Sequence, residues 1–509
     1  MAEAADADRA DTIVIGGGTA GAVIAARLVE SGRSVLLLEA GPDYGPLDDG
    51  GWPDDLLDAA SLPTSHDWGY TGAGAGGQPL LFDRARVIGG CSSHNGCTQT
   101  AGWSGDWDAL AEDAGDGWSA RSMRPFFASA AERMRLREYT AAEIQPFHAA
   151  FLGACTSAGL PRRDDLVDLD GGVGAGVAPV NTRGTVRINT AGAYLDAVRD
   201  DPLLTIRANA LVDRITFSGA RADGVEYFVG AERRTARADL IVLSAGAYGS
   251  PEVLLRSGVG PAEELRALGI PVVRDLPAVG RNLHDHPTVQ LEFAGTAALA
   301  EAPREFGRTQ WVPEEQAMAK LRSPFADGPF DLHVYPWVEP DEAQASGWRV
   351  ILPVSQLRPR SRGSVRLRST DPSITAAVDP RFFSDREGAD LGSVEFGIRW
   401  VADELCAGPL AEYLGDPIGT DPRELAGEGL RDWMRRSHTH YWHPAGTLRM
   451  GRTDDPSSVV DGAAAVLGID GLHVADASIF PDIPRATPAL PTVAAAERIA
   501  ALLVAVHAP

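Results

Sequence analysis

The amino-acid sequence predicts an α/β protein, α+β overall, with a parallel-sheet domain assembled from separated segments and a second domain that holds an antiparallel sheet and helices. Three observations predict this fold. The 509 residues are too many for one ordinary hydrophobic core. A short apolar strand, a glycine-rich turn and an alanine-rich helix follow one another from residue 11. Further apolar strands followed by small residues recur far along the chain, on either side of a region with a different strand pattern.

The composition is that of a packed globular protein with an acidic surface. Apolar residues make up 44% of the chain, and 70 acidic against 46 basic residues give a net charge of −24. Such a field repels nucleic acid and anionic membranes, so we expect no polyanionic partner. The charge would favour a cationic substrate, but acidic surfaces also serve solubility alone.

Targeting and redox signals are weak. The segment Met1 to Asp11 is acidic and lacks the basic and apolar regions of a secretory signal, and no apolar stretch approaches the ~20 residues that span a bilayer. The four cysteines are too few and too scattered for a disulfide framework, and we interpret them as reduced thiols. We therefore expect a cytoplasmic protein without a membrane span, either a monomer or a homodimer.

The first predicted strand, residues 11–15, leads into a glycine-rich turn that reads Gly-Gly-Gly-Thr-Ala-Gly. Gly16 allows a tight turn, and Gly18 lets the backbone approach a pyrophosphate. Gly21 lets the following helix pack closely on the strand, so that the helix N-terminus faces the phosphates. The pattern predicts a Rossmann-like dinucleotide site, with a glycine-rich turn that binds no ligand as the alternative.

A second predicted strand, residues 34–38, ends at Glu39. A carboxylate in this place accepts hydrogen bonds from a ribose diol. Both FAD and NAD are bound by this unit, so the first 40 residues leave the two cofactors unresolved.

A segment at residues 84–96 contains two adjacent glycines, Gly89 and Gly90, before a Cys-Ser-Ser-His-Asn run. Glycines can press the backbone flat against a planar ring because no side chain intervenes. The segment resembles the glucose–methanol–choline (GMC) oxidoreductase family, and it is most similar to the choline oxidase branch. That resemblance implies FAD as cofactor and a covalent bond between His94 and the flavin, where the family more commonly carries an aliphatic residue. The alternative is that His94 only packs beside the ring.

The resemblance extends along nearly the whole chain. Residues 246–260 match a second family signature at every defined position, and they follow an apolar strand at residues 239–244. Other segments that resemble the family lie at residues 187–195, 279–287, 362–367 and 474–481. Besides the residues named above, the resemblance implies cofactor contacts at Arg86, Ser93, Asn95, Val212, Ala245, Asp476 and Ala477.

These segments define a discontinuous organisation. The FAD-binding domain is expected to comprise residues 1–150, 185–290 and 436–509, and the substrate-binding domain residues 151–184 and 291–435. Within the latter, residues 331–337 and 349–355 are predicted strands. Segments rich in Gly, Asp and Pro at 41–80 and 161–185 are predicted loops, either at the substrate entrance or as solvated connectors.

The general base is expected within residues 437–451, where a His-Pro-Ala-Gly-Thr sequence resembles the family motif. Alcohol oxidation by a flavin needs an acceptor for the hydroxyl proton, and histidine suits this because its charge changes near neutral pH. The resemblance assigns that role to His443. A protonated His443 could then stabilise a developing superoxide anion if oxygen is the acceptor.

The sequence departs from the family at its second active-site position. Where His or Asn is usual, Ala489 stands or, with a shift of one residue, Pro488. His443 then acts alone, or His333 or Tyr335 supplies the missing contact to the substrate, unless these two belong to an ordinary half-buried strand. Gly96 replaces a serine that positions the substrate in choline oxidases, so the resemblance does not carry choline over as substrate.

Other residues of this region are candidates for the pocket wall or for a metal site. The resemblance places Tyr441 near the oxygen-reactive face of the flavin, where its bulk would hinder oxygen, and Trp442 is a further candidate for the pocket wall. His438 and His440 follow no recognised metal-ligand spacing, so no metal is expected. His284 and His286 flank Asp285 in a block tied to flavin binding, which favours a structural role.

Three functions remain open. The first is an alcohol oxidase that acts on a small alcohol and reduces oxygen. The second is an alcohol dehydrogenase of the same fold that passes electrons to a quinone, a redox peptide cofactor or a carrier protein. A flavin-bearing lyase or a catalytically silent flavoprotein is the third and least favoured, and the sequence does not distinguish among alcohols, sugars and amino alcohols.

Overall fold

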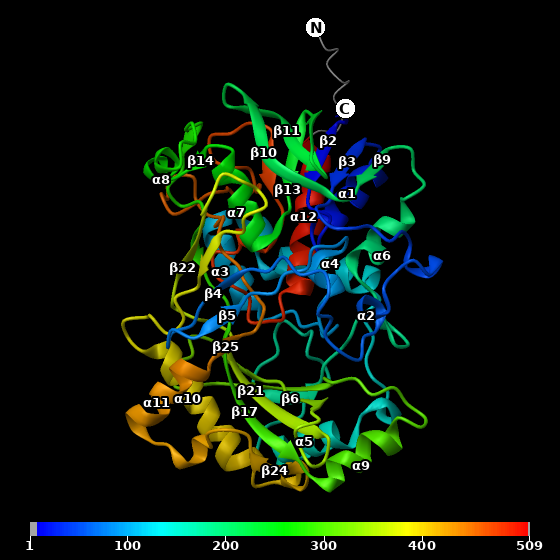
Figure 1. Ribbon diagram of the computed structural model, residues 1–509, viewed down its shortest axis with the longest axis vertical. Coiled ribbons are helices and arrows are strands. Elements are labelled where there is room, and N and C mark those ends of the chain that lie inside the picture. The colour runs from blue at the N-terminus through cyan, green and yellow to red at the C-terminus, as the bar shows by residue number, and fades with distance from the viewer. Residues whose placement is uncertain (1–7, 507–509) are drawn as a thin grey trace.

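The computed structural model describes residues 8–506 and has two parts, one above the other in Figure 1. The upper part contains a parallel sheet with helices around it, and the lower part contains a large antiparallel sheet with helices on its outer side. The first seven residues of the acidic N-terminal segment lie outside the described residues. Among the described helices, none combines the length and the apolar character needed to span a bilayer.

The upper part is built on a five-stranded parallel sheet in the order β26-β13-β2-β3-β9. Its strands are β2 (Thr12–Ile15), β3 (Val35–Leu38), β9 (Leu204–Arg207), β13 (Leu240–Leu243) and β26 (Leu472–Val474). β2, β3 and β13 are buried along their whole length, which is why they read as continuous apolar runs. Helices α1 (Gly21–Glu30) and α12 (Ala489–Val506) pack against each other beside the sheet. The prediction of a Rossmann-like domain assembled from distant segments is confirmed.

Smaller sheets and helices complete the upper part. A four-stranded sheet consists of β1 (Asp8–Arg9), β12 (Glu232–Arg237), β11 (Arg221–Val229) and β10 (Ala210–Ser218). A three-stranded sheet consists of β16 (Arg281–Leu283), β22 (Gly363–Arg366) and β23 (Ala377–Asp379), and short pairs are formed by β4 (Thr71–Ala73) with β5 (Pro79–Leu81), β7 (Thr182–Arg183) with β8 (Val186–Arg187), and β14 (Val259–Gly260) with β15 (Arg274–Asp275). The helices are α2 (Asp54–Leu57), α3 (Ser104–Ala114), α4 (Ala120–Arg133), α6 (Thr190–Tyr194), α7 (Gly246–Arg256) and α8 (Ala262–Ala267).

The lower part is built on an antiparallel sheet in the order β24-β17-β21-β19-β18-β6, with β20 beside β21 and β25 beside β17. The strands are β6 (Gly174–Val177), β17 (Pro287–Gly295), β18 (Ala317–Leu321), β19 (Leu332–Val334), β20 (Trp337–Pro340), β21 (Trp348–Gln356), β24 (Leu414–Pro417) and β25 (Thr439–His440). Helices α5 (Pro146–Ser157), α9 (Ala297–Phe306), α10 (Ala389–Trp400) and α11 (Gly427–Ser437) lie with this part. The predicted antiparallel sheet with helices is therefore confirmed.

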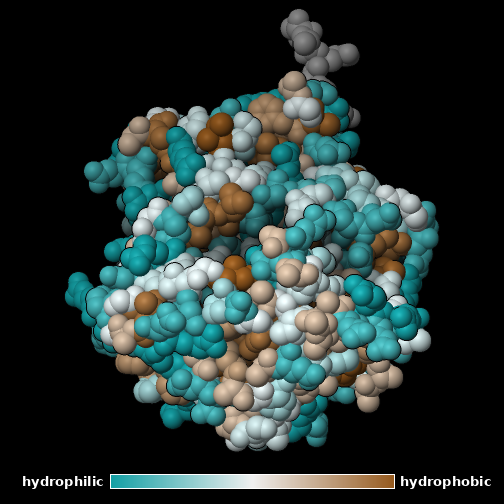
Figure 2. All heavy atoms as spheres, turned by 60° about the horizontal axis from the view of Figure 1, so that its bottom comes forward, coloured by the Kyte–Doolittle hydropathy of each residue, from teal (hydrophilic) through white to brown (hydrophobic). Residues whose placement is uncertain are grey.

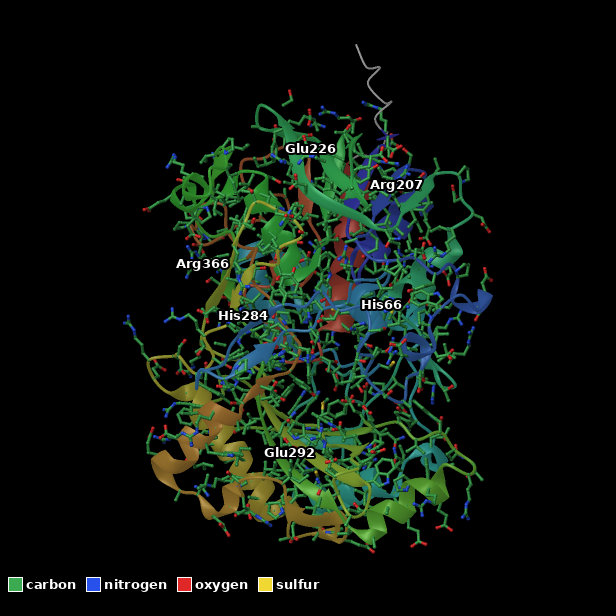
Figure 3. All side chains as sticks on the ribbon, in the orientation of Figure 1. His66, Arg207, Glu226, His284, Glu292 and Arg366 are labelled. Carbon is green, nitrogen blue, oxygen red and sulfur yellow. The ribbon has the colours of Figure 1, made fainter. Side chains whose placement is uncertain are left out.

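The two hydrophobic cores divide the chain at slightly different residues from those expected. Helix α5 buries Phe147 and Phe151 in the lower core. The chain therefore enters the lower part at residue 146, whereas the substrate-binding domain was expected to begin at residue 151. Strand β17 already pairs with β21 from Thr288. In Figure 3, His284 lies near the level where the two parts meet, whereas Glu292 on β17 lies inside the lower part. Strands β22 and β23, expected in the substrate-binding domain, pair with β16 of the upper part because their buried face covers Tyr248 and Phe82.

The surface is mixed in character. Hydrophilic residues cover much of the face in Figure 2, and the most hydrophobic residues, in brown, appear there in scattered groups. All four cysteines are free thiols, as the sequence predicts.

Candidate active site

A cavity of about 490 Å³ lies between the parallel sheet of the upper part and the antiparallel sheet of the lower part. The predicted site residues that line it are Gly16, Gly18, Glu39, Gly90, His94, Asn95, Val212, Ala245, Asp476, Ala477, Tyr335, Tyr441, Trp442, His443 and Ala489. Of the two segments that the sequence predicts as loops, residues 41–80 contribute to the wall through residues 62–70, and residues 161–185 contribute nothing. Gly21, Arg86, Gly89, Ser93 and His333 lie outside the wall.

At one end of the cavity the glycine turn packs directly against the segment that carries His94. A Cβ atom added to Gly21 would lie 1.9 Å from the carbonyl oxygen of Gly16, so only glycine lets α1 approach the turn. A Cβ added to Gly90 would lie 2.7 Å from the Cα of Gly18. These contacts leave backbone N–H groups and the N-terminus of α1 facing the cavity, which is the arrangement that binds a pyrophosphate.

Glu39 ends β3 and is held by backbone amides. Its Oε2 accepts a hydrogen bond of 2.8 Å from the N–H of Gly17, and its Oε1 accepts one of 2.7 Å from the N–H of Gly41. Burial raises the pKa of this carboxyl above its usual value, although the two amides act in the opposite direction. Each carboxylate oxygen keeps a further lone pair for a ribose hydroxyl, and Val212 on β10 lies in the same wall.

Asp476 connects the two helix N-termini that reach the cavity from the C-terminal half. Its carboxylate accepts hydrogen bonds from the N–H of Gly246, from the hydroxyl of Ser250 and from the N–H of Ser478. These bonds fix the start of α7 beside Ala245 and order the turn at Ala477. The same burial that makes the bonds strong raises the pKa of Asp476.

His94 lies on the cavity wall just after the turn Gly90–Ser93, and its ring nitrogen Nε2 has no hydrogen-bond partner among the described residues. Burial, and to a smaller extent the charges of Arg84 and Arg187, lowers the pKa of His94 to about 4. The imidazole is therefore neutral at neutral pH, in the cavity wall.

The residues around His94 support this placement. Gly89 adopts a φ of 84°, and a Cβ there would collide with the hydroxyl of Ser93, which itself donates to the carbonyl of Ile88. The side-chain oxygen of Asn95 accepts the N–H of Cys97. Arg86 is exposed, and its guanidinium lies 4.8 Å from the ring centroid of Trp68. Gly89 and Ser93 thus shape the turn from behind, while Arg86 lies outside it.

His443 stands on the opposite side, and the block at residues 284–286 positions it. The N–H of His443 donates to Oδ1 of Asp285, at 2.9 Å. Its Nδ1 lies 3.0 Å from Nδ1 of His286, so one of the two nitrogens carries the shared proton. Burial first, and then the charges of His286 and Arg84, lowers the pKa of His443 well below its ordinary value. His443 is therefore neutral at neutral pH, the state that a general base requires.

Aromatic side chains surround His443. The ring of Tyr441 lies 4.4 Å from that of His443, and the buried hydroxyl of Tyr441 has no hydrogen-bond partner in the described part of the chain. The indole of Trp442 approaches Asp83, and the hydroxyl of Tyr335 contacts that of Thr98. These side chains leave a mainly apolar space in front of the base.

His333 does not line the cavity. It is fully buried on β19, opposite Lys320 on β18, and neither ring nitrogen has a hydrogen-bond partner among the described residues. Its ring lies 6.4 Å from that of Tyr441, between centroids. Ala489 at the start of α12 does line the cavity but offers no polar atom beyond its backbone.

The other histidines of this region have local partners. Nε2 of His438 accepts the N–H of Ala75, and Nε2 of His440 donates to the carbonyl of Leu81. Nδ1 of His284 contacts the carbonyl of Asn282. Through these hydrogen bonds to backbone atoms, the three histidines stabilise the loops around the cavity.

Three further residues reach the site although the sequence did not single them out for it. Arg84 lines the cavity and donates to the carbonyl of Trp442, at 2.8 Å. His286 contacts the base directly, and Glu315 places a carboxyl in the wall. The Asp-His-Pro block was visible in the sequence as a family segment, whereas Glu315 lies outside every recognised motif.

Comparisons with known proteins agree with this site. Models of the GMC oxidoreductase family match residues 10–288 and 359–496. Choline oxidase of Arthrobacter globiformis is 33% identical over 97% of this chain and 94% of its own length. The 5-(hydroxymethyl)furfural oxidase of Methylovorus sp. (strain MP688) is 32% identical over 96% of this chain and 98% of its own length.

Solved structures share the fold. Pyridoxine 4-oxidase from Mesorbium loti superposes with a TM-score of 0.82 at 29% identity, over 96% of this chain and 98% of that one. A mutant formate oxidase of Aspergillus oryzae RIB40, studied for FAD modification, superposes with a TM-score of 0.85 at 23% identity over 99% of both chains. The chain therefore belongs to the GMC oxidoreductase family and is an FAD-dependent oxidoreductase.

Proposed function

We propose that this enzyme oxidises the CH–OH group of a small alcohol to an aldehyde or ketone, with His443 as general base and oxygen as electron acceptor. The observation that carries the proposal is the imidazole of His443 in the cavity wall, with a pKa well below its ordinary value and Nδ1 engaged by His286. The family members named above as choline, 5-(hydroxymethyl)furfural and pyridoxine oxidases support an alcohol as the substrate class.

The chain's own groups account for the proton. If Nδ1 of His443 donates to His286, its Nε2 has a free lone pair and takes the proton of a substrate hydroxyl. The positive charge of Arg84 beside His443 then stabilises the developing alkoxide. The same charge and the apolar surroundings disfavour the imidazolium. FAD, when bound, accepts the hydride from the substrate carbon.

The residues present fit FAD at this place. The cradle has no room for a side chain at Gly16 or Gly90, and Glu39 offers two acceptor oxygens at the ribose end. We propose that His94 additionally bonds the flavin covalently through Nε2, because that buried nitrogen has no partner and its ring is neutral. Packing of His94 beside the flavin remains the alternative.

The role of the base is tested by His443→Gln and His443→Ala. We expect anaerobic reduction of the flavin by alcohol in a stopped-flow instrument to slow by about 10²- to 10⁴-fold, because the hydroxyl proton loses its acceptor. The control is reduction by dithionite, which needs no base and should proceed as in the wild type. Full alcohol-driven reduction at an unchanged rate in the alanine variant would refute the assignment.

The covalent bond is tested by acid denaturation of the purified enzyme. We expect the yellow colour to precipitate with the protein and to be released into the supernatant in a His94→Ala variant. Release of all colour from the wild-type protein would show that His94 only packs beside the flavin.

A dehydrogenase is the second candidate, and Tyr441 favours it. The buried phenol lies against the base, in the place where the sequence predicts that its bulk would hinder oxygen. Stopped-flow mixing of the reduced enzyme with oxygen distinguishes the two. Fast bimolecular reoxidation with hydrogen peroxide as product supports the oxidase, whereas slow reoxidation that a quinone accelerates supports the dehydrogenase.

A further inference from the structure

His66 adopts a backbone conformation that residues other than glycine rarely take. Its φ is 59°, in the left-handed region, where such a residue persists only if its surroundings hold it. The carbonyl of His66 accepts a hydrogen bond of 2.6 Å from the N–H of Arg86. Figure 3 shows His66 near the level where the two parts meet, across the view from His284. The side-chain contacts of His66 show what else holds it there.

Four side chains of residues 44–66, that of His66 among them, form one chain of hydrogen bonds. The hydroxyl of Ser65 donates to Oδ2 of Asp55, at 2.6 Å, and lowers the pKa of that carboxyl, which is therefore charged. A hydroxyl has a single proton, so Nδ1 of His66, 2.6 Å from the oxygen of Ser65, is the donor in that contact. Nε2 of His66 then accepts from the hydroxyl of Tyr44, at 2.7 Å. Each of these bonds has one direction, and together they fix the position of Ser65.

The backbone of Ser65 contacts the ring of His94. Burial has the largest effect on the pKa of His94 and lowers it, whereas a hydrogen bond to the backbone of Ser65 acts in the opposite direction. A bond that raises the pKa of an imidazole is one in which the ring N–H donates, here to a carbonyl. Nε2 of His94 has no hydrogen-bond partner among the described residues, so the donor is Nδ1. His94 therefore carries its proton on Nδ1 and keeps the lone pair of Nε2 free.

We propose that the chain of Tyr44, His66, Ser65 and Asp55 fixes this tautomer of His94, so that the protein attaches FAD to His94 without the help of another protein. His66 is a positioning residue in this reaction, because it acts on His94 through Ser65. The inference rests on the covalent bond that is part of the proposed function, and it does not depend on alcohol oxidation at His443.

The attachment balances with oxygen as the oxidant. The 8α-methyl carbon of FAD loses one hydrogen as a proton to solvent, and the lone pair of Nε2 of His94 forms the bond to that carbon. Nδ1 gives up its proton, also to solvent. The electron pair of the broken C–H bond passes into the flavin and then to oxygen, which takes two protons and becomes hydrogen peroxide. The bond needs a lone pair on Nε2, so a His94 ring with its proton on that nitrogen cannot react.

The first test reads the tautomer directly, in the full chain purified without FAD from riboflavin-starved cells. In protein with ¹⁵N-labelled histidine, the nitrogen chemical shifts show which ring atom carries the proton, and His94→Ala identifies the signals. We expect the proton of His94 on Nδ1 in the wild type and a mixture of both tautomers in His66→Leu. A proton on Nε2 in the wild type would overturn the inference.

The second test follows the attachment itself. FAD is added in air to the FAD-free protein, and covalent flavin is measured over time as colour that precipitates with the protein in acid. His66→Leu removes the donor to Ser65, and we expect attachment to slow about three- to tenfold, the effect of one hydrogen bond. His66→Asn keeps a donor near the place of Nδ1 and tolerates a left-handed φ, so its rate should stay within about twofold of the wild type.

Two controls separate this effect from a general loss of structure. Noncovalent binding of FAD, measured by the quenching of flavin fluorescence, should be equal in the wild type and both His66 variants. Arg135→Leu places a leucine at another left-handed position, with a φ of 53°, at an exposed residue that does not line the cavity. It introduces the same backbone strain, and attachment should proceed as in the wild type.

An unchanged rate of attachment in His66→Leu, or equal slowing in His66→Leu and His66→Asn, would also overturn the inference. A wild-type protein that binds FAD only noncovalently would overturn it together with the proposed bond to His94. Alcohol oxidation at His443 fails separately, because alcohol would then leave the flavin oxidised whether or not the flavin is attached.

Discussion

The pair His443 and His286 shows how two neighbouring imidazoles determine which nitrogen acts as base. Their Nδ1 atoms lie 3.0 Å apart, and only one of them can carry the proton between them. With the proton on His443, its Nε2 is a free acceptor. With the proton on His286, the Nε2 of a neutral His443 carries hydrogen and cannot accept another. His286 is therefore a positioning residue whose task is to accept.

Replacing His286 tests this assignment. In His286→Leu the acceptor is gone, and we expect anaerobic flavin reduction to slow by about ten- to hundredfold, a part of the general-base contribution. In His286→Asn the amide oxygen takes the place of Nδ1, so the rate should stay within about threefold of the wild type. Equal rates in the two variants would contradict the acceptor role.

The pH profile gives a readout that a loss of packing alone would not move. Burial first, and then the adjacent imidazole of His286, beside which a second charge is disfavoured, lowers the pKa of His443, so the neutral base persists below pH 6.5 in the wild type. Without His286 this effect is absent and the pKa of His443 rises. We therefore expect the acid limb of kcat/KM to move to higher pH in both variants, with Arg84→Met as a third variant that moves it the same way because a positive charge is removed.

Residues in short motifs were predictable, and residues placed by the fold were not. His443, His94 and the glycines belong to local patterns whose chemistry the sequence displays directly. The position of Glu315 depends on the space left by Gly96, more than two hundred positions earlier in the chain. His333, a candidate for the cavity wall, is separated from it because β19 turns this side chain toward Lys320 on the neighbouring strand. Pairing between distant strands leaves no local trace in the sequence.

At the scale of elements, the glycine turn decides how closely α1 approaches the parallel sheet. Gly21→Ala would place a methyl group 1.9 Å from the carbonyl oxygen of Gly16. The helix must then move away from β2, and its N-terminus moves away from the pyrophosphate. We expect this variant to be purified largely without FAD, as measured by the ratio of absorbance at 450 nm to that at 280 nm.

A matched control is Gly153→Ala in helix α5. There the new Cβ would meet only Cγ of Pro409, at 3.9 Å, which is an ordinary contact. We expect full FAD occupancy and a gain in stability of up to about 1 kcal/mol, because alanine favours the helix. A Gly21→Ala enzyme with normal FAD content would contradict the close packing of α1 on its turn.

Elements with a strong local period were also the ones that the sequence predicted. β2, β3, β13 and β21 were expected from their apolar runs, and α1 from the alanine-rich stretch after the turn. β6 was missed within a predicted loop, because its small residues Gly174 to Val177 gain their strand form only by pairing with β18. The same holds for the β4–β5 pair, whose Gly72 and Pro79 carry no strand preference of their own.

At the scale of the whole molecule, ion pairs around the buried Arg485 connect the two parts. Arg485, which is 1% exposed, forms ion pairs with Asp106 on α3 and with Asp327 after β18. Arg358 adds ion pairs from the segment after β21 to Asp106 and Asp482. Asp106 has a raised pKa because burial outweighs these cations, so it depends on them for its charge.

Removing Arg485 should therefore loosen the junction of the two parts. We expect Arg485→Met to lower stability by about 3 to 5 kcal/mol, because Asp106 is left buried without its closest cation. The measurement is the midpoint of thermal unfolding of the FAD-loaded enzyme. Arg452→Met is the control, since Arg452 and Asp454 are 61% and 68% exposed and solvent screens their ion pair. Adding Asp106→Asn to Arg485→Met removes the uncompensated charge, so the double variant should be more stable than Arg485→Met alone. A double variant that is no more stable than Arg485→Met would show that the arginine acts by packing over Trp103, 5.1 Å from its guanidinium, rather than by charge.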